Sequence, residues 1–225
     1  MMECKHNVGC FLNFFKVSNL AGAECLINSK LYSKRRFSMI ETVKNKVEQI
    51  VEQACAADTN IFGYDIWTHH ILPVVHNAKQ LAPRFDADPE IVEFAALLHD
   101  YASIKDEALY ADHHIHGPIE AEKLLKRFGY RKEKTEAVKD AIATHRGSVT
   151  VKHRSAEGAC LANADAMSHI EQVPSLLYLA YVHHGMGIDE GKVWVKAKLQ
   201  RSWQKLQEDV QDMVRDKYEA ALRIL

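Results

Sequence analysis

Histidine is the residue type that points to chemistry in this 225-residue chain: there are thirteen copies, and twelve lie between residues 69 and 184. Imidazole is the commonest metal ligand in proteins, and a soluble surface rarely needs so many. His70 lies on the apolar stripe of an expected helix, four residues before Val74 and eight before Ala78. A buried imidazole needs partners for its ring nitrogens. His70 is therefore either a core histidine bonded to a carbonyl or water, or a metal ligand.

The pair His99-Asp100 follows a nearly all-apolar segment, residues 91–98. Adjacent residues on a helix diverge by about 100°, so both side chains can reach one centre only if the helix ends there. Residues 101–103 are expected to form that ending. A carboxylate at the inner end of an apolar helix needs a cation, because a desolvated lone anion is very unfavourable. The alternative is that Asp100 caps a helix or forms an ordinary salt bridge.

Asp165 is a second carboxylate that needs a cation, since it lies among small and apolar residues in the segment 159–167. His70, His99, Asp100 and Asp165 would together form a nitrogen and oxygen site, which suits Mn, Fe, Co, Ni or Zn rather than thiolate-selected metals. Four protein ligands on a metal that accepts six leave positions for water and substrate. Such an open site is typical of catalysis rather than of structural metal binding.

The series His70, His99-Asp100, Asp165 resembles the HD-domain superfamily of metal-dependent phosphohydrolases, over roughly residues 60–185. The dipeptide alone is weak evidence, but four such residues in order on helices are a specific pattern. The resemblance implies an all-α bundle with the metal site in its core and these four residues as primary ligands. Pro73 departs from the pattern, since many members have Arg there. We expect it to remove a backbone bond to the carbonyl of His69 and to kink the helix beside His70.

Further histidines fit the version of this motif that holds two metals. His113, four residues before Gly117, resembles the histidine that two-metal members place before a small residue, and His145 looks like its partner from the following helix. Asp100 would then bridge two ions about 3.5–4 Å apart. The alternative is one ion, with phosphate oxygens contacted by a set of basic residues: His113, His114, His116, Lys105 and Arg146.

The remaining histidines have no assigned role in this hypothesis. His169, four residues after Asp165, is either an ordinary packing residue or a support for a ligand from behind. Exposed or ordinary packing positions are expected for the others: His69, His76, His153, His183 and His184.

The chemistry implied is hydrolysis of a phosphate ester or anhydride of a small molecule, with a nucleotide as one candidate. Asp100 would position a divalent metal and accept a hydrogen bond from the attacking water. Lys105, Arg146 or a histidine that is not a ligand would offset charge on the phosphate oxygens and protonate the leaving oxygen. Two other functions remain open: a di-iron oxygenase on the same fold, and a non-catalytic domain that binds a nucleotide.

Composition and missing motifs exclude several other classes. Charge is nearly balanced, with 29 Lys and Arg against 30 Asp and Glu, so a nucleic acid polymer is not expected as a partner. No P-loop, dinucleotide-binding glycine motif or serine nucleophile motif occurs. No run is apolar enough to span a membrane. Five cysteines without a Cys-x-x-Cys pair fit a reducing, cytoplasmic setting.

The elements that must position these residues are helices. With ten Gly and five Pro, turns are scarce, and apolar residues recur at three- and four-residue steps from Met39 onward. We expect a single-domain bundle of about seven to eight helices over residues 39–225, with the motif core at about 60–185. A long last helix, about 190–225, would pack on the bundle or form a homodimer. Residues 1–38 are expected to be a loosely packed extension.

Overall fold

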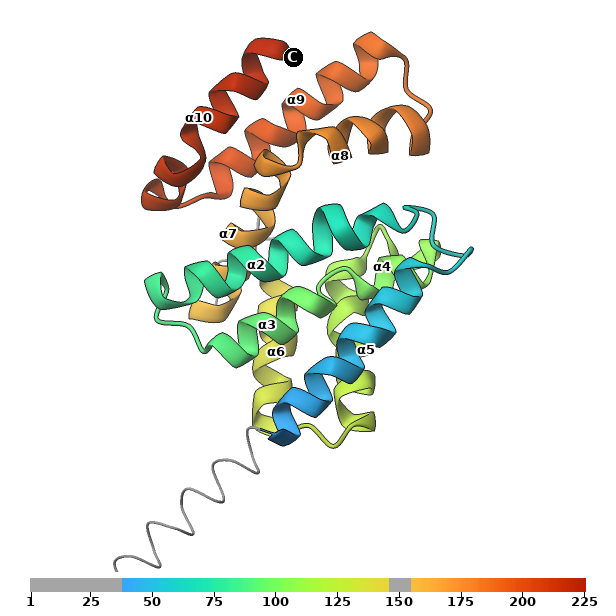
Figure 1. Cartoon of the computed structure of the whole chain (residues 1–225), viewed down its shortest axis with the longest axis vertical. Coiled ribbons are helices and arrows are strands. Elements are labelled where there is room, and N and C mark those ends of the chain that lie inside the picture. Colours follow the sequence, from blue (N-terminus) through green and yellow to red (C-terminus); the bar gives the residue numbers. More distant parts are fainter. Residues whose placement is uncertain (1–37, 146–154) are drawn as a thin grey trace, which may run out of the picture. The chain divides into compact units, whose positions relative to one another are not determined.

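The computed structural model describes residues 38–145 and 155–225 of the chain. The chain divides into two units, residues 1–42 and 43–225, and the contacts described below lie within the second. The described residues form helices and helical turns joined by short loops, with no strand among them (Figure 1). The all-α class predicted from the sequence is confirmed. Within these ranges no helix has both the length and the apolar character that a membrane span requires.

Ten α-helices lie within the described residues, more than the seven or eight expected, because α4 and α8 are short and the last helix is divided. A first helix covers residues 38–55. The following elements are η1 (Trp67–Ile71), α2 (Leu72–Leu81), η2 (Ala82–Arg84), α3 (Pro89–Leu98), α4 (Tyr101–Lys105), η3 (Glu107–Leu109), α5 (His113–Arg127), α6 (Lys132–His145), α7 (Ala156–Glu171), α8 (Val173–Tyr178), η4 (Leu179–His183), α9 (Ile188–Lys205) and α10 (Glu208–Ile224). Of the shorter turns, η1 and η4 are π-helical and η2 and η3 are 3-10 helical.

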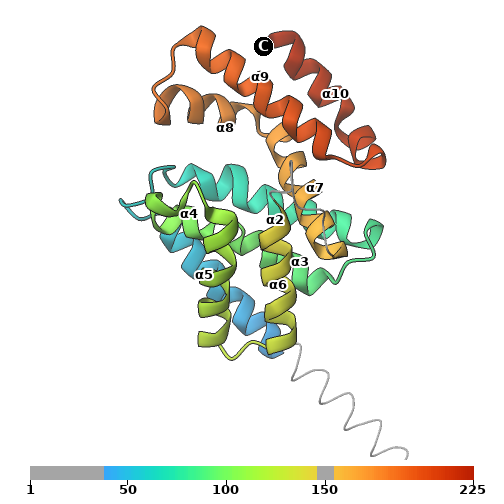
Figure 2. The ribbon, with the colours of Figure 1, turned by 180° about the vertical axis from the view of Figure 1, so that it is seen from behind.

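Helix α7 is the central element of the second unit. It contacts α2, α3 and α6 along one part of its length and α8, α9 and α10 along another. Figure 2 shows α7 running from the α6 side to the α9–α10 pair, as Figure 1 does from the opposite side. Every residue from Cys160 to Ile170 is buried. Because three of them are alanines (Ala162, Ala164, Ala166), neighbouring helices approach closely, and α7 carries Asp165 into the interior.

Side-chain caps fix where two of the helices that carry the site, α3 and α7, begin. The Asp88 carboxylate accepts hydrogen bonds from the backbone N–H groups of Glu90 and Ile91, and Pro89 occupies the first position of α3. Ser155 accepts one from the N–H of Gly158 at the start of α7. Helix α3 ends at Leu98, and His99 is its C-cap residue. The predicted ending at His99-Asp100 is thus confirmed.

Pro73 is accommodated by a wide turn rather than by a simple kink. The five residues before α2 form the π-helical turn η1, in which the N–H of Leu72 bonds the carbonyl of Trp67, five residues back. Proline has no N–H and its ring clashes with the carbonyl four residues back, here that of His69. The wider turn relieves that clash. His70 therefore projects from a π-helical turn, in which the angular spacing of side chains differs from that of an α-helix.

Helix α5 begins at His113, with Pro118 inside its first two turns. One boundary differs from the sequence prediction. The long helix expected over about 190–225 is two helices, because Leu206 adopts extended backbone angles between α9 and α10. The N–H of Gln207 donates to the side-chain oxygen of buried Asn163 on α7 at 2.8 Å, which satisfies the backbone at this break. The predicted boundary between the extension and the domain stays a prediction, since residues 1–37 lie outside the described residues.

Close packing of α7 on α6 predicts that a methyl group added at Gly158 will destabilise the fold. A Cβ there would clash with the hydroxyl of Thr144, while every other neighbour lies at ordinary distances. We expect Gly158→Ala to lower the free energy of unfolding by about 1–3 kcal/mol, as overpacking does. Urea denaturation measures the change. In a Thr144→Ala background the added methyl should cost much less, and an equal cost in both backgrounds would contradict this packing.

Candidate metal centre

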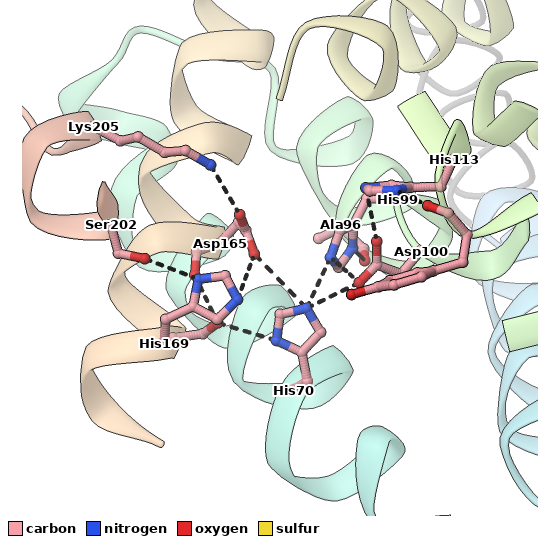
Figure 3. A network of polar contacts seen from close by, with 11 residues as sticks. His70, Ala96, His99, Asp100, His113, Asp165, His169, Ser202 and Lys205 are labelled. Atoms are coloured by element: carbon pink, nitrogen blue, oxygen red, sulfur yellow. Dashed lines mark hydrogen bonds and ion pairs between the residues drawn. The ribbon is translucent and has the colours of Figure 1, made fainter. Parts of the chain in front are cut away.

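Three residues from separate parts of the fold meet at the end of α3. The Nε2 atom of His70, on η1, lies 3.2 Å from Nε2 of His99 and 3.1 Å from Oδ2 of Asp100 (Figure 3). His99 Nε2 and Asp100 Oδ2 are 3.3 Å apart. His99 is almost fully buried, and Asp100 occupies the N-cap position of α4 without capping it by its side chain. The alternative in which Asp100 is a helix cap therefore does not apply.

Asp165 reaches the same place from α7. Its Oδ1 atom lies 3.7 Å from Nε2 of His70 and 3.6 Å from Nε2 of His169. His169 lies beside His70 with the two rings stacked, 5.3 Å between centroids and 14° between planes. The four residues expected to be primary ligands thus converge, and His169 joins them. His70, Asp165 and His169 form one group of donors that could hold an ion, and His70, His99 and Asp100 form another.

A further group of donors uses the other oxygen of Asp100. Its Oδ1 atom lies 3.6 Å from Nε2 of His113 on α5. The ring of His145, at the end of α6, lies 5.6 Å from that of His113 and 5.3 Å from that of His99. Donor atoms of Asp100, His113 and His145 all lie within 4.8 Å of one another. Asp100 therefore belongs to two donor groups at once, one through each oxygen.

Hydrogen bonds to the outer nitrogens orient the imidazoles. The Nδ1–H groups of His99, His113 and His145 donate to the carbonyls of Ala96, Tyr110 and Ile142 at 2.8, 2.8 and 2.5 Å. His70 Nδ1 lies 3.3 Å from Ser168 Oγ, whose hydroxyl donates to the Asp165 carbonyl and can thus accept from the ring. A proton held on Nδ1 leaves the Nε2 lone pair for a metal. All four rings are arranged in this way.

The charges around the cluster favour a cation. Burial lowers the pKa of His99, but the charges of Asp100 and Asp165 and the hydrogen bond to Asp100 outweigh it and raise this pKa to about 9. Burial raises the pKa of Asp100, yet His99 and His70 hold it well below its usual range. Burial and the nearby charge of His99 lower the pKa of His145 to about 3, so its ring is neutral. Without a metal, a proton on His99 takes the cation's place.

The donor set fits a divalent transition metal. It consists of imidazole nitrogens and carboxylate oxygens, which Mn, Fe, Co, Ni and Zn accept. A pocket of about 360 Å³ opens beside the donors, and His70, Asp100, His113, His145 and Asp165 form part of its wall. The hydroxyl of Ser103, three residues after Asp100, lines the same pocket and is buried without a hydrogen-bond partner. Such an arrangement leaves room for water and a substrate at the ion.

Comparison with known proteins found a family match for part of the chain. The family model for the HD domain matches residues 67–170. This segment of the chain is an HD domain. HD domains bind divalent metals, and the side chains described above lie within or beside this segment. A comparison with curated proteins by sequence found no match.

Solved structures share the fold. YpgQ from Bacillus subtilis matches with a TM-score of 0.63 at 20% identity, covering 82% of this chain and 92% of its own. The same protein in complex with ADP gives the same score and covers 83% and 93%. A predicted HD superfamily hydrolase from an uncultured Thermotogales bacterium matches with a TM-score of 0.52 at 23% identity, over 80% and 87% of the two chains. At these identities the likeness concerns the fold.

Not every predicted residue of the HD domain reaches the pocket. Lys105 does not line it, because its ammonium pairs with Glu120 of α5 at 2.7 Å. His114 and His116 do not line it either. The structure does not bring these three residues to the pocket wall, and the phosphate contacts expected of them stay predictions. Arg146, the third expected catalytic residue, lies outside the described residues.

Other pocket residues were missed by the sequence reasoning. His69 and His183 line the pocket, although ordinary positions were expected for both, and His183 Nε2 donates to the carbonyl of Phe62 at 3.1 Å. Helix α9 contributes Lys198, Arg201 and Lys205. Their spacing of three and four residues places them on one helical face, which was the available signal.

The raised pKa of His99 predicts competition between protons and metal. At pH 7 the metal-free site holds a proton on this ring, which an ion must displace to bind Nε2. We expect Mn²⁺ affinity to rise about tenfold per pH unit between pH 7 and 9, with about one proton released per ion. Calorimetry in two buffers of different ionisation enthalpy measures both quantities. His76→Gln should leave them unchanged, whereas an affinity independent of pH would contradict the prediction.

Proposed function

We propose that this protein is a metal-dependent phosphohydrolase, which cleaves a phosphate ester or anhydride of a small molecule. The observation that carries the proposal is the position of Asp100, shared by two donor groups at the wall of an open pocket. A donor group that only stabilised the fold would be closed on all sides. One structural neighbour, the Thermotogales protein, is a predicted HD superfamily hydrolase, which supports the same reaction class. A nucleotide is the first candidate substrate, and the ADP complex of YpgQ supports it.

His70, His99, Asp100 and Asp165 would hold one divalent ion, and Asp100, His113 and His145 a second. A bound divalent ion supplies Lewis acidity, which activates water and draws charge from a phosphoryl oxygen. Ala96, Tyr110 and Ile142 keep the proton of three of these rings on Nδ1, away from the reacting atoms. Enclosure by α3 and α7 keeps bulk water from competing for the ligands.

The reaction exchanges one bond to phosphorus for another. The water oxygen bonds to phosphorus, the bond from phosphorus to the leaving oxygen breaks, and a proton passes from the water to the leaving oxygen. Asp100 accepts a hydrogen bond from the water and orients it. His69 and His183 are the pocket-lining histidines outside the donor groups, and either can deliver a proton to the leaving oxygen. Arg146 remains a predicted contact to the phosphate oxygens.

Replacement of Asp100 tests the reaction. Loss of a residue that supports a ligand costs 10- to 100-fold in metalloenzymes, so loss of a shared ligand should cost at least about a hundredfold. We expect Asp100→Asn to lower Mn²⁺-dependent phosphate release by that factor in a screen of nucleotides and sugar phosphates. The matched control is Asp106→Asn, which removes the same charge from an exposed position outside the pocket. Full activity of Asp100→Asn would refute the mechanism.

The number of ions can be tested separately. If Asp100, His113 and His145 hold their own ion, His145→Ala should reduce bound Mn²⁺ from two per chain to one, and His70→Ala should affect the other. Metal analysis after equilibrium dialysis gives the count. His116→Ala, one turn along α5 from His113, should keep both ions. One ion per chain in the unaltered protein would show that the group at His145 contacts phosphate or has only a structural role.

A further inference from the structure

Helix α9 presents a row of cations to the pocket. Lys198, Arg201 and Lys205 follow one another at steps of three and four residues, and all three line the cavity. This places them along one helical face, about 10 Å from end to end. The HD family match ends at residue 170, so α9 lies outside the matched segment. The row is therefore a feature of this chain's own C-terminal part.

The three cations differ in what they face. Lys205 lies 3.8 Å from Oδ2 of Asp165 and thus has a carboxylate partner within the site. Lys198 and Arg201 form no ion pair with any carboxylate of the described residues. Lys198 is half-buried, and burial lowers its pKa even though Asp165 and Asp100 act in the opposite direction. A partly desolvated cation with no partner is unfavourable until an anion joins it.

The same pocket has an aromatic wall. Trp194 lines it one helical turn before Lys198 on α9, together with Phe62, Tyr178 and His183. Three of these rings form a contiguous group, since the ring centroids of Phe62 and His183 are 6.2 Å apart and those of Tyr178 and His183 are 5.3 Å apart. Flat π-faces of this kind stack on nucleobases, a contact worth about 1–3 kcal/mol per base.

We propose that α9 binds the phosphate chain of a nucleoside diphosphate or triphosphate, with Lys198 and Arg201 on the phosphates beside the one that is attacked. The base then lies against Trp194 and the aromatic wall. The proposal rests on the proposed function, because it places the attacked phosphate at the donor groups of Asp100. A monoester has a single phosphate, which the metal ions neutralise. Two cations without carboxylate partners match the additional charge of a longer chain.

Binding measurements on the full-length chain test this assignment. The probes are α,β-methylene-ADP, whose bridge resists hydrolysis, AMP and inorganic pyrophosphate, each titrated with Mn²⁺ present. We expect Lys198→Met and Arg201→Gln each to weaken the binding of α,β-methylene-ADP at least tenfold, which corresponds to 1.4 kcal/mol. The binding of AMP should weaken less than threefold in the same variants. The matched control is Lys196→Met, which removes the same charge from the same helix at a position outside the pocket.

A second variant separates the base from the phosphates. Trp194→Leu should weaken the binding of α,β-methylene-ADP and of AMP by a similar factor and leave the binding of pyrophosphate unchanged. Arg201 is exposed, so its replacement does not threaten folding, and bound Mn²⁺ per chain reports whether each variant keeps its donor groups.

The outcomes distinguish this inference from the proposed function. Unchanged affinities in Lys198→Met and Arg201→Gln overturn the role of α9, whether or not the protein hydrolyses phosphate esters. An equal loss for AMP and α,β-methylene-ADP also overturns it, because the cations would then serve a single phosphate. A selective loss of α,β-methylene-ADP binding, with AMP binding retained, supports the role of α9. If that loss occurs in a protein without hydrolytic activity, the binding assignment holds and the proposed hydrolysis fails.

Discussion

The structure depends on the burial of two carboxylates within an apolar helical core. Asp100 and Asp165 lie where water cannot solvate them fully, and a lone buried anion would cost several kcal/mol. The fold compensates by surrounding them with imidazoles, of which His99 holds a proton when no other cation is present. This requirement explains why η1, α3, α5, α6 and α7 meet at the same place. Each brings a nitrogen or an oxygen to the shared charge.

Helix α7 connects this cluster to the wall built by α9. Ser168 accepts from His70, His169 Nδ1 lies 3.2 Å from Ser202 Oγ on α9, and Lys205 faces Asp165. Asn163 holds the backbone of Gln207 where α9 ends. The segment of α7 from Asn163 to His169 therefore both orients the donors and fixes the helix opposite them. Both walls of the pocket are therefore anchored to the same buried segment of α7.

Much of the centre could be predicted because its polar residues lie in segments that are otherwise apolar. A His-Asp pair at the end of an apolar segment, and Asp165 among alanines, stand out without any structure. Lys198 and Arg201 do not, since α9 also carries Lys192 and Lys196 and looks like an ordinary solvated helix. Only tertiary packing decides which of its faces meets the pocket. The ion pair of Lys105 could not be foreseen for the same reason, because its partner Glu120 lies fifteen residues away. The break at Leu206 lacks Gly or Pro and depends on Asn163.

The end of the HD match at residue 170, ahead of α9, has a consequence for how such a protein can diversify. The residues that would hold the ion lie within the matched segment, whereas the three cations and Trp194 follow it on α9. Recombination near residue 185 would exchange selectivity while retaining the reactive centre. The anchors of α9 to α7, at Asn163, Asp165 and His169, would need to be matched in a chimera.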